Sequence, residues 1–199
     1  QTKDEIGHGT FLAGVTAGSD NGKYEGVAPE SEIICVKLAK AKKYARENSM
    51  LFGEDIIAYQ ETNLIIGISY LIKKAREYNM PISILLGVGS SQGSHEGLIY
   101  ERITNNTRGM AITSACGNEG NTMKHAMGKL EFTNDVKELK VHIADGEQGI
   151  AIYLWGYAPD KISVGIVTPS REVMDRVPVR NTTQAHLSLI FYDTTIWID

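Results

Sequence analysis

The segment from residue 55 to residue 87 limits the possible folds more than any other, because it joins a long helical pattern to a short apolar run. In the helix expected over 55–78, the apolar side chains that recur every three or four residues are Leu64, Ile68, Leu71, Ile72 and Ala75. Pro81 should end this helix, and the run Ile82–Leu86 is apolar throughout, as buried parallel strands are. The pattern therefore predicts a helix that lies on a parallel sheet.

Helix-like and strand-like segments alternate through the first two thirds of the chain. Besides the segment above, the expected elements are helices over 10–17 and from Ser94 to about 107, and strands over 33–38 and 110–116. This alternation predicts an α/β fold with a parallel sheet and flanking helices. Ligands bind such sheets beyond the carboxyl ends of the strands, where the glycine-containing loops 87–93 and 117–121 are expected.

The pattern changes after about Gly128, where apolar and polar residues alternate with a period of two. The segments with this pattern are 129–132, 139–143 and 150–155, and turn-forming pairs such as Asp145-Gly146 separate them. Short alternating strands at roughly ten-residue spacing are typical of an antiparallel β-sandwich. We therefore expect two domains, residues 1–127 and residues 128–199.

Composition and charge exclude several classes of partner. The chain of 199 residues has 42% hydrophobic residues and a formal net charge of −4, so a nucleic-acid-binding surface is not expected. No apolar run approaches the roughly 20 residues of a membrane span. Cys35 and Cys116 lie in apolar runs and are expected to be buried free thiols, and their number gives no spacing for a metal site.

Two glycine-flanked polar residues could together perform acyl transfer. His8 stands at the start of the first helix and could take a proton from a hydroxyl nucleophile. Asn118 follows a buried strand between Gly117 and Gly120, and its amide could donate to the oxyanion of a tetrahedral intermediate. The plainer alternatives are a structural or exposed histidine and an asparagine that merely tolerates a turn.

The motifs around these residues resemble those of subtilisin-like serine proteases, the subtilases. The similar stretches are Gly7–Gly14 at the histidine, Gly26–Pro29, Val36–Leu38 and Ala115–Asn121 at the oxyanion asparagine. The resemblance covers residues 1 to about 127. It implies that His8 is the general base and Asn118 the oxyanion donor, and that Leu85, Leu86, Gly87 and Gly117 line a peptide or protein substrate.

A narrower resemblance is to the clostridial Csp-type branch of this family, in which a jelly-roll domain is inserted after the oxyanion asparagine. The stretches that carry it are 59–71, 93–97 and 121–128. It implies that residues 128–199 are most of such an insertion and that the protein is spore-associated or extracellular. A bound propeptide is a further partner that it allows. We expect no metal ion or cofactor: some relatives bind calcium in the loop at residues 19–23, but here Lys23 brings a positive charge and few carboxylates are present.

Two parts of the family's catalytic machinery have no counterpart in this sequence. The family's aspartate lies in an Asp-Ser-Gly or Asp-Thr-Gly motif, whereas Asp4 stands in neither, and no Gly-Thr-Ser motif with the nucleophile occurs in residues 128–199. We therefore expect an internal fragment of a serine endopeptidase that is inactive alone. The alternatives are a pseudoprotease or protein-binding scaffold of the same family, and a carbohydrate-binding module in residues 128–199.

Overall fold

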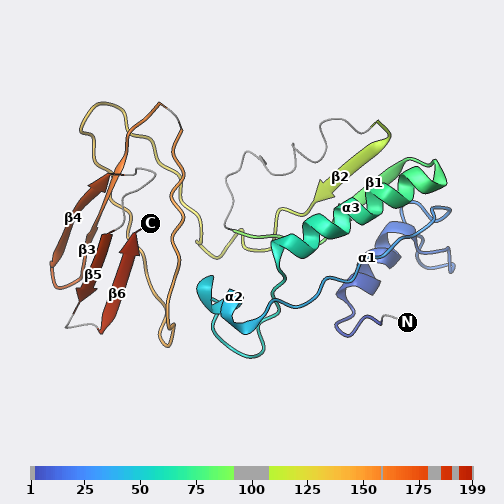
Figure 1. The fold of residues 1–199 in the computed structure, drawn as a ribbon, viewed down its shortest axis with the longest axis horizontal. Helices are drawn as coiled ribbons and strands as arrows, with labels where there is room; N and C mark the ends of the chain where they lie inside the picture. The colour runs from blue at the N-terminus through green and yellow to red at the C-terminus, as the bar shows by residue number, and fades with distance from the viewer. Residues whose placement is uncertain (1–2, 92–107, 158, 179–184, 190–192, 199) are drawn as a thin grey trace. The chain divides into compact units, whose positions relative to one another are not determined.

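A computed structural model describes residues 3–91, 108–157, 159–178, 185–189 and 193–198 (Figure 1). The chain divides into two compact units, Gln1–Ile152 and Tyr153–Asp199. The helix expected from Ser94 to about residue 107 lies outside the described residues. The boundary expected near residue 127 remains a prediction.

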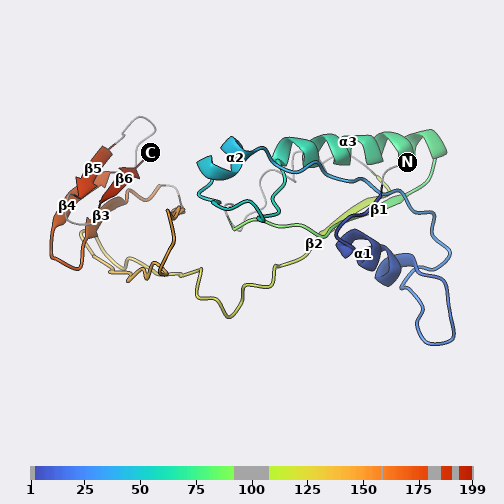
Figure 2. The ribbon, with the colours of Figure 1, turned by 90° about the horizontal axis from the view of Figure 1, so that it is seen from below.

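The core of the first unit is one helix on a two-stranded parallel sheet. Helix α3 spans Glu61–Tyr78, and the strands β1, Ile82–Leu86, and β2, Met110–Ser114, pair in parallel with Ile84 opposite Ile112. Both ribbon views show α3 running alongside this pair (Figures 1 and 2). The most buried side chains are Ile68 at 1% exposure, Ile84 at 3% and Leu86 at 6%. The partly buried residues packed around them include Leu64, Leu71 and Ile72. The helical stripe and the buried parallel strand that the sequence predicts are confirmed.

Helix α3 begins later than the sequence pattern indicates. The helix starts at Glu61 rather than near residue 55, because the preceding chain is bound by a side chain. Nη1 of Arg46 donates to the carbonyl oxygens of Gly53 at 3.1 Å and of Ile56 at 3.0 Å, among others. The helix ends at Tyr78, and the next residue, Asn79, has a left-handed φ of 52° two residues before Pro81.

Helix α1 spans His8–Ala17 and is held at its far end by the following loop. The amides of Gly26, Val27 and Ala28 donate to carbonyl oxygens near the end of the helix, at 2.8, 3.1 and 2.8 Å. The segment Gly26–Pro29 therefore docks on α1. A short helix that the sequence pattern does not show, α2, spans Lys43–Asn48.

The segment 33–38, expected to be a strand, forms no strand in the structure. Strand formation requires a partner, and this segment instead packs a side chain against α3: a Cβ atom added to Gly67 would lie 3.1 Å from Cγ1 of Val36. The chain then forms a single antiparallel bridge, between Lys40 and Tyr59. Strand β2 also ends at Ser114, two residues before the expected end of the strand at 116.

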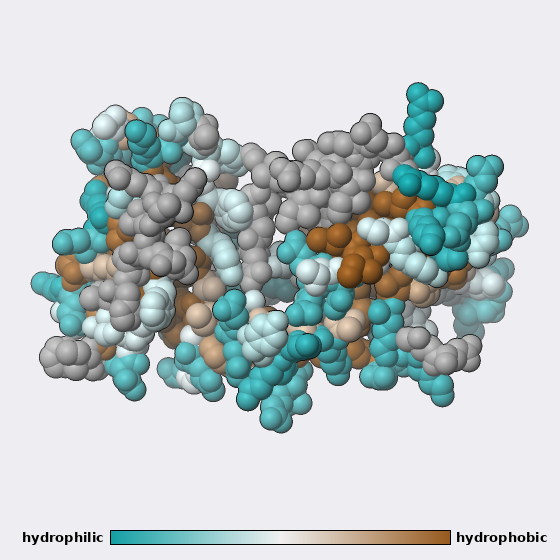
Figure 3. Space-filling model, in the orientation of Figure 1, coloured by the Kyte–Doolittle hydropathy of each residue, from teal (hydrophilic) through white to brown (hydrophobic). Residues whose placement is uncertain are grey.

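The expected strands over 129–132, 139–143 and 150–155 are likewise not formed. Alternation marks a chain that could be half-buried in a sheet, but these segments make no ladder and their apolar residues stay exposed. Exposed examples are Phe132, Leu139, Ile152 and Trp155. Figure 3 colours hydrophobic residues brown and shows them reaching the surface at several places on the face in view.

The described part of the second unit contains two antiparallel strand pairs, and antiparallel pairing is what the sequence predicts for this part of the chain. Strands β3, Ser163–Val167, and β4, Val173–Pro178, pair with a register shift between Val164 and Ile166, and β5, Ala185–Leu189, pairs with β6, Thr194–Ile198. Each hairpin is a separate two-stranded sheet. Among the described residues of the whole chain, no helix is both long and apolar enough to span a membrane.

Candidate active site

The histidine expected to act as a base is the first residue of α1. It follows Gly7, which has a φ of 88° in the left-handed region, where a side chain would be strained. The glycine therefore allows the sharp turn by which the chain enters the helix. His8 is exposed at this turn.

The carboxylate of Asp4 binds the beginning of α1. Its Oδ1 accepts from the amides of Ile6 at 3.0 Å and Gly7 at 2.9 Å, and its Oδ2 accepts from the amide of Thr10 at 2.8 Å and the Thr10 hydroxyl at 2.7 Å. The amide of Gly7, then that of Ile6, then the hydroxyl and amide of Thr10 hold the pKa of this carboxyl well below its usual range. Asp4 thus satisfies one amide of the first helical turn, that of Thr10, which the N-cap residue Gly7 has no side chain to bind.

Sequence reasoning missed this role of Asp4. The available signal was an aspartate three residues before a glycine at a helix start, with a threonine that can donate further along. The expectation that Asp4 does not belong to the family's aspartate motif is unaffected, because its described bonds go to Ile6, Gly7 and Thr10.

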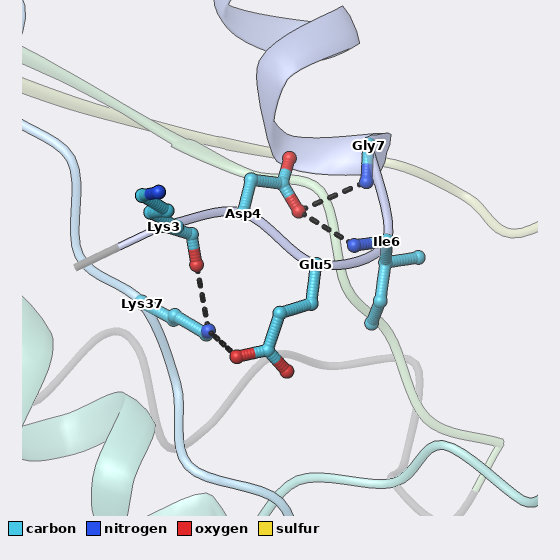
Figure 4. A network of polar contacts seen from close by, with 6 residues as sticks. All are labelled: Lys3, Asp4, Glu5, Ile6, Gly7 and Lys37. Atoms are coloured by element: carbon cyan, nitrogen blue, oxygen red, sulfur yellow. Dashed lines mark hydrogen bonds and ion pairs between the residues drawn. The ribbon is translucent and has the colours of Figure 1, made fainter.

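A second contact anchors the loop that precedes His8. Nζ of Lys37 donates to the carbonyl oxygen of Lys3 at 2.7 Å and to Oε1 of Glu5 at 3.0 Å (Figure 4). The hydrogen bond from Lys37 lowers the pKa of the Glu5 carboxyl. The loop is therefore tied on one side to α1 and on the other to the segment that packs on α3.

His8 meets the end of strand β1. A Cβ atom added to Gly87 would lie 3.5 Å from Cε1 of His8 and would overlap Cδ1 of Leu12, one turn along the same helix. Gly87 is the residue directly after β1. The structure therefore brings the expected base against the expected substrate-binding glycine, at the carboxyl end of a parallel strand.

Three of the four residues expected to line substrate, Leu85, Leu86 and Gly87, lie in β1 or directly after it, and they differ in exposure and backbone direction. Leu86 is buried beneath α3, whereas Leu85 is 46% exposed on the other face. The amide of Ala115 donates to the carbonyl oxygen of Leu86, at 3.4 Å, so the backbone of Leu86 faces β2. Since alternate residues of a strand direct their backbone groups to opposite edges, Leu85 and Gly87 face away from β2.

Asn118 lies in the loop that follows β2, four residues beyond its end. Gly117 before it has a φ of 86°, and a Cβ atom there would overlap Oε2 of Glu119. That same oxygen accepts from the amide of Asn118 at 2.9 Å. Because Leu86 and Ser114 are partners in the β1–β2 register, the loops that carry Gly87 and Asn118 leave the sheet at the same edge.

The two cysteines are free thiols, but both are exposed, so the expectation that they are buried is wrong. Cys35 lies in the segment that forms no strand and Cys116 lies beyond the end of β2, so no sheet layer covers either. Within the described ranges, no three or more His, Cys, Asp or Glu side chains gather as metal ligands would.

Comparison with known proteins finds similarity to a serine protease. The chain is 27% identical over 176 residues to the major intracellular serine protease of Bacillus subtilis (strain 168), across 88% of this chain and 48% of that protein. It thus spans about half the length of that relative. No protein-family model and no solved structure matches. The sequence similarity supports a distant relationship of this chain to the subtilisin-like serine proteases.

Proposed function

We propose that this chain is part of the catalytic domain of a serine endopeptidase and carries the general base and one oxyanion donor of its active site. The observation that carries the proposal is the closeness of His8 to Gly87 at the carboxyl end of β1, since a Cβ atom added to Gly87 would lie 3.5 Å from Cε1 of His8; parallel α/β sheets bind ligands at this edge. The relationship to a serine protease supports the same reaction.

In this proposal, His8 moves a proton twice. The neutral imidazole takes the proton of a serine hydroxyl as its oxygen bonds to the scissile carbonyl carbon, and the imidazolium then gives that proton to the departing amine. Water repeats the sequence and releases the acid product. The serine and the carboxylate that orients His8 belong to the remainder of the protein, so the chain alone is inactive.

The side-chain amide of Asn118 donates to the oxyanion while it carries its negative charge. Asn118 is exposed on its loop, and its backbone amide is already bound by Glu119, so the carboxamide is the group left for a ligand. The left-handed Gly117 gives the loop its direction.

The substrate binds as an added strand on the edge of β1 that faces away from β2. Within the described part of the chain, β1 pairs with β2 alone, and Leu85 and Gly87 direct their backbone groups to the opposite edge. A peptide there would form main-chain hydrogen bonds beside His8. Leu86 supports the strand through the core, and Gly117 borders the carbonyl that is attacked.

The remaining parts of the proposal rest on the family resemblance. Residues 128–199 form most of a jelly-roll insertion of the Csp-type branch, and the antiparallel β3–β4 and β5–β6 hairpins are compatible with it. The protein is spore-associated or extracellular, its substrates are proteins or peptides, and a propeptide is a further occupant of the substrate edge.

Hydrolysis of casein by the full-length protein tests the proposal. The variant His8→Ala should lose about 10⁶-fold in kcat, a size known for the same change in subtilisin itself, whereas His142→Ala, which removes an exposed histidine outside any strand, should keep full activity. A wild-type protein that hydrolyses nothing would contradict the proposal and favour the pseudoprotease alternative.

A further inference from the structure

We propose that Asp4 is a positioning residue that holds the imidazole of His8 against Gly87; this inference rests on the proposed function. Asp4 is not a catalytic residue, because it acts only through the backbone that carries His8.

The first support is that the donors of the four hydrogen bonds to Asp4 lie on both sides of His8 in the chain. Oδ1 binds the amides of Ile6 and Gly7, which precede His8, and Oδ2 binds the amide and hydroxyl of Thr10, which follows it. One carboxylate therefore spans the backbone on both sides of the histidine. Figure 4 shows the Oδ1 half of this arrangement, with the second oxygen directed toward α1.

The second support is the fixation of Asp4 itself. Its two neighbours, Lys3 and Glu5, both bind Nζ of Lys37. Val36, next to Lys37, lies against Gly67 of α3, the helix that covers the core. The loop is thereby connected to the core on the α3 side, while His8 contacts the end of β1 on the other.

The third support is that the position of His8 beside Gly87 depends on the first turn of α1. The space beside Gly87 is occupied by both His8 and Leu12 of the same helix. A rotation or fraying of the first turn of α1 would move the imidazole away from the edge where the substrate strand is placed. Misplacement of a reacting group by about 1 Å can lower turnover about 100-fold.

A nuclear Overhauser contact tests the positioning without any assay of activity. In the isotope-labelled wild-type chain, the Cε1 proton of His8 should show a cross-peak to the α protons of Gly87. Asp4→Asn leaves one acceptor oxygen instead of two, so it should lose that cross-peak. Asp20→Asn makes the same chemical change in another exposed turn, where Asp20 accepts from the amide of Gly22 at 2.7 Å, and should keep it.

The full-length protein supplies the second readout. Asp4→Asn should lower kcat about 10- to 100-fold with KM unchanged, whereas a loss of folded protein would lower the active fraction without changing the kcat of active sites counted by titration. Thr10→Ser keeps the hydroxyl donor and should retain kcat, while Thr10→Val removes it and should lower kcat less than Asp4→Asn does. If Asp4→Asn does not fold, the Thr10 pair decides.

The results separate this inference from the proposed function. A wild-type protein without hydrolytic activity overturns the proposed function, and the cross-peak still shows whether Asp4 positions His8. An active protein in which Asp4→Asn keeps both the cross-peak and kcat overturns the inference alone. Loss of the cross-peak with unchanged kcat also overturns it.

Discussion

A Cβ atom on Gly87 would lie 3.5 Å from Cε1 of His8, so the first turn of α1 lies close to the end of β1. These residues are 79 positions apart in the sequence. Their contact is the feature from which the site is built.

Gly87→Ala should therefore displace α1 and lower turnover. The added methyl would overlap Leu12 and lie in van der Waals contact with His8, and overpacking of this kind costs about 1–3 kcal/mol. We expect a drop in kcat of about 10-fold or more in the full-length protein. Gly89→Ala is the matched control, since a Cβ atom there meets nothing within 4 Å. Equal activity of the two variants would contradict the contact.

Two glycines of α1, Gly7 before its first residue and Gly14 inside it, should respond oppositely when they are replaced by alanine. Gly7→Ala places a side chain at a φ of 88° and should lower the free energy of unfolding by about 1–2 kcal/mol. Gly14→Ala lies within the helix in open space and should raise it by about 0.5–1 kcal/mol. Urea unfolding measures both, and a Gly7→Ala variant as stable as wild type would show that the turn is not left-handed in solution.

Truncation of the central core residue should be costly. Ile68 is 1% exposed among Ile84 and Leu86, so Ile68→Ala should lower the free energy of unfolding by about 2–5 kcal/mol. Ile66 is 66% exposed on the same helix, and Ile66→Ala should change stability little. Chemical denaturation followed by circular dichroism compares them, and equal losses would mean that α3 presents a different face to the sheet.

Stability should depend on pH through Asp4. The folded carboxyl has a pKa below its ordinary value of 3.8, so in acid the unfolded state binds more protons and stability falls as pH falls. The contribution of Asp4 is complete above about pH 5 and is lost progressively below about pH 4. The difference in unfolding free energy between wild type and Asp4→Asn should shrink over that window. A difference that stays constant from pH 7 to the acid limit would contradict the hydrogen bonding of Asp4.

Local periodicity was enough to predict the centre of the fold. Helix α3 and strand β1 were predicted because their apolar residues are regularly spaced over a long window, and one buried residue, Ile68, confirms which face of the helix is covered. The same reasoning failed for 33–38 and 139–143. Apolar or alternating sequence shows that a segment could form a strand, but pairing depends on a distant partner that the pattern does not contain.

The candidate site likewise contains residues that the sequence pattern indicates and residues that it does not. Glycine-flanked His8 and Asn118 were visible in the sequence as candidates, because their neighbours are residues that tight turns require. The cap by Asp4 was not visible, since it depends on a loop that curls so that one carboxylate reaches Gly7 and Thr10 together. The hydrogen bonds from Lys37 to Lys3 and Glu5 join residues more than 30 positions apart, and no local pattern predicts such contacts.

The proposed oxyanion role of Asn118 predicts a loss of turnover with little loss of substrate binding. Asn118→Ala should lower kcat about 10²–10³-fold, the size known for the corresponding asparagine of subtilisin itself, and should leave KM nearly unchanged. Asn121→Ala, in the same exposed loop, is the control and should retain activity. A large rise in KM with unchanged kcat would instead assign Asn118 to ground-state binding.

Labelling of the full-length protein by a fluorophosphonate probe tests whether His8 activates a serine nucleophile. The probe reacts with a serine hydroxyl only when a base such as His8 takes its proton. The proposed role of His8 as general base predicts stoichiometric labelling of the wild type, none of His8→Ala and full labelling of His142→Ala. Absence of labelling in the wild type, or equal labelling of His8→Ala, would contradict it.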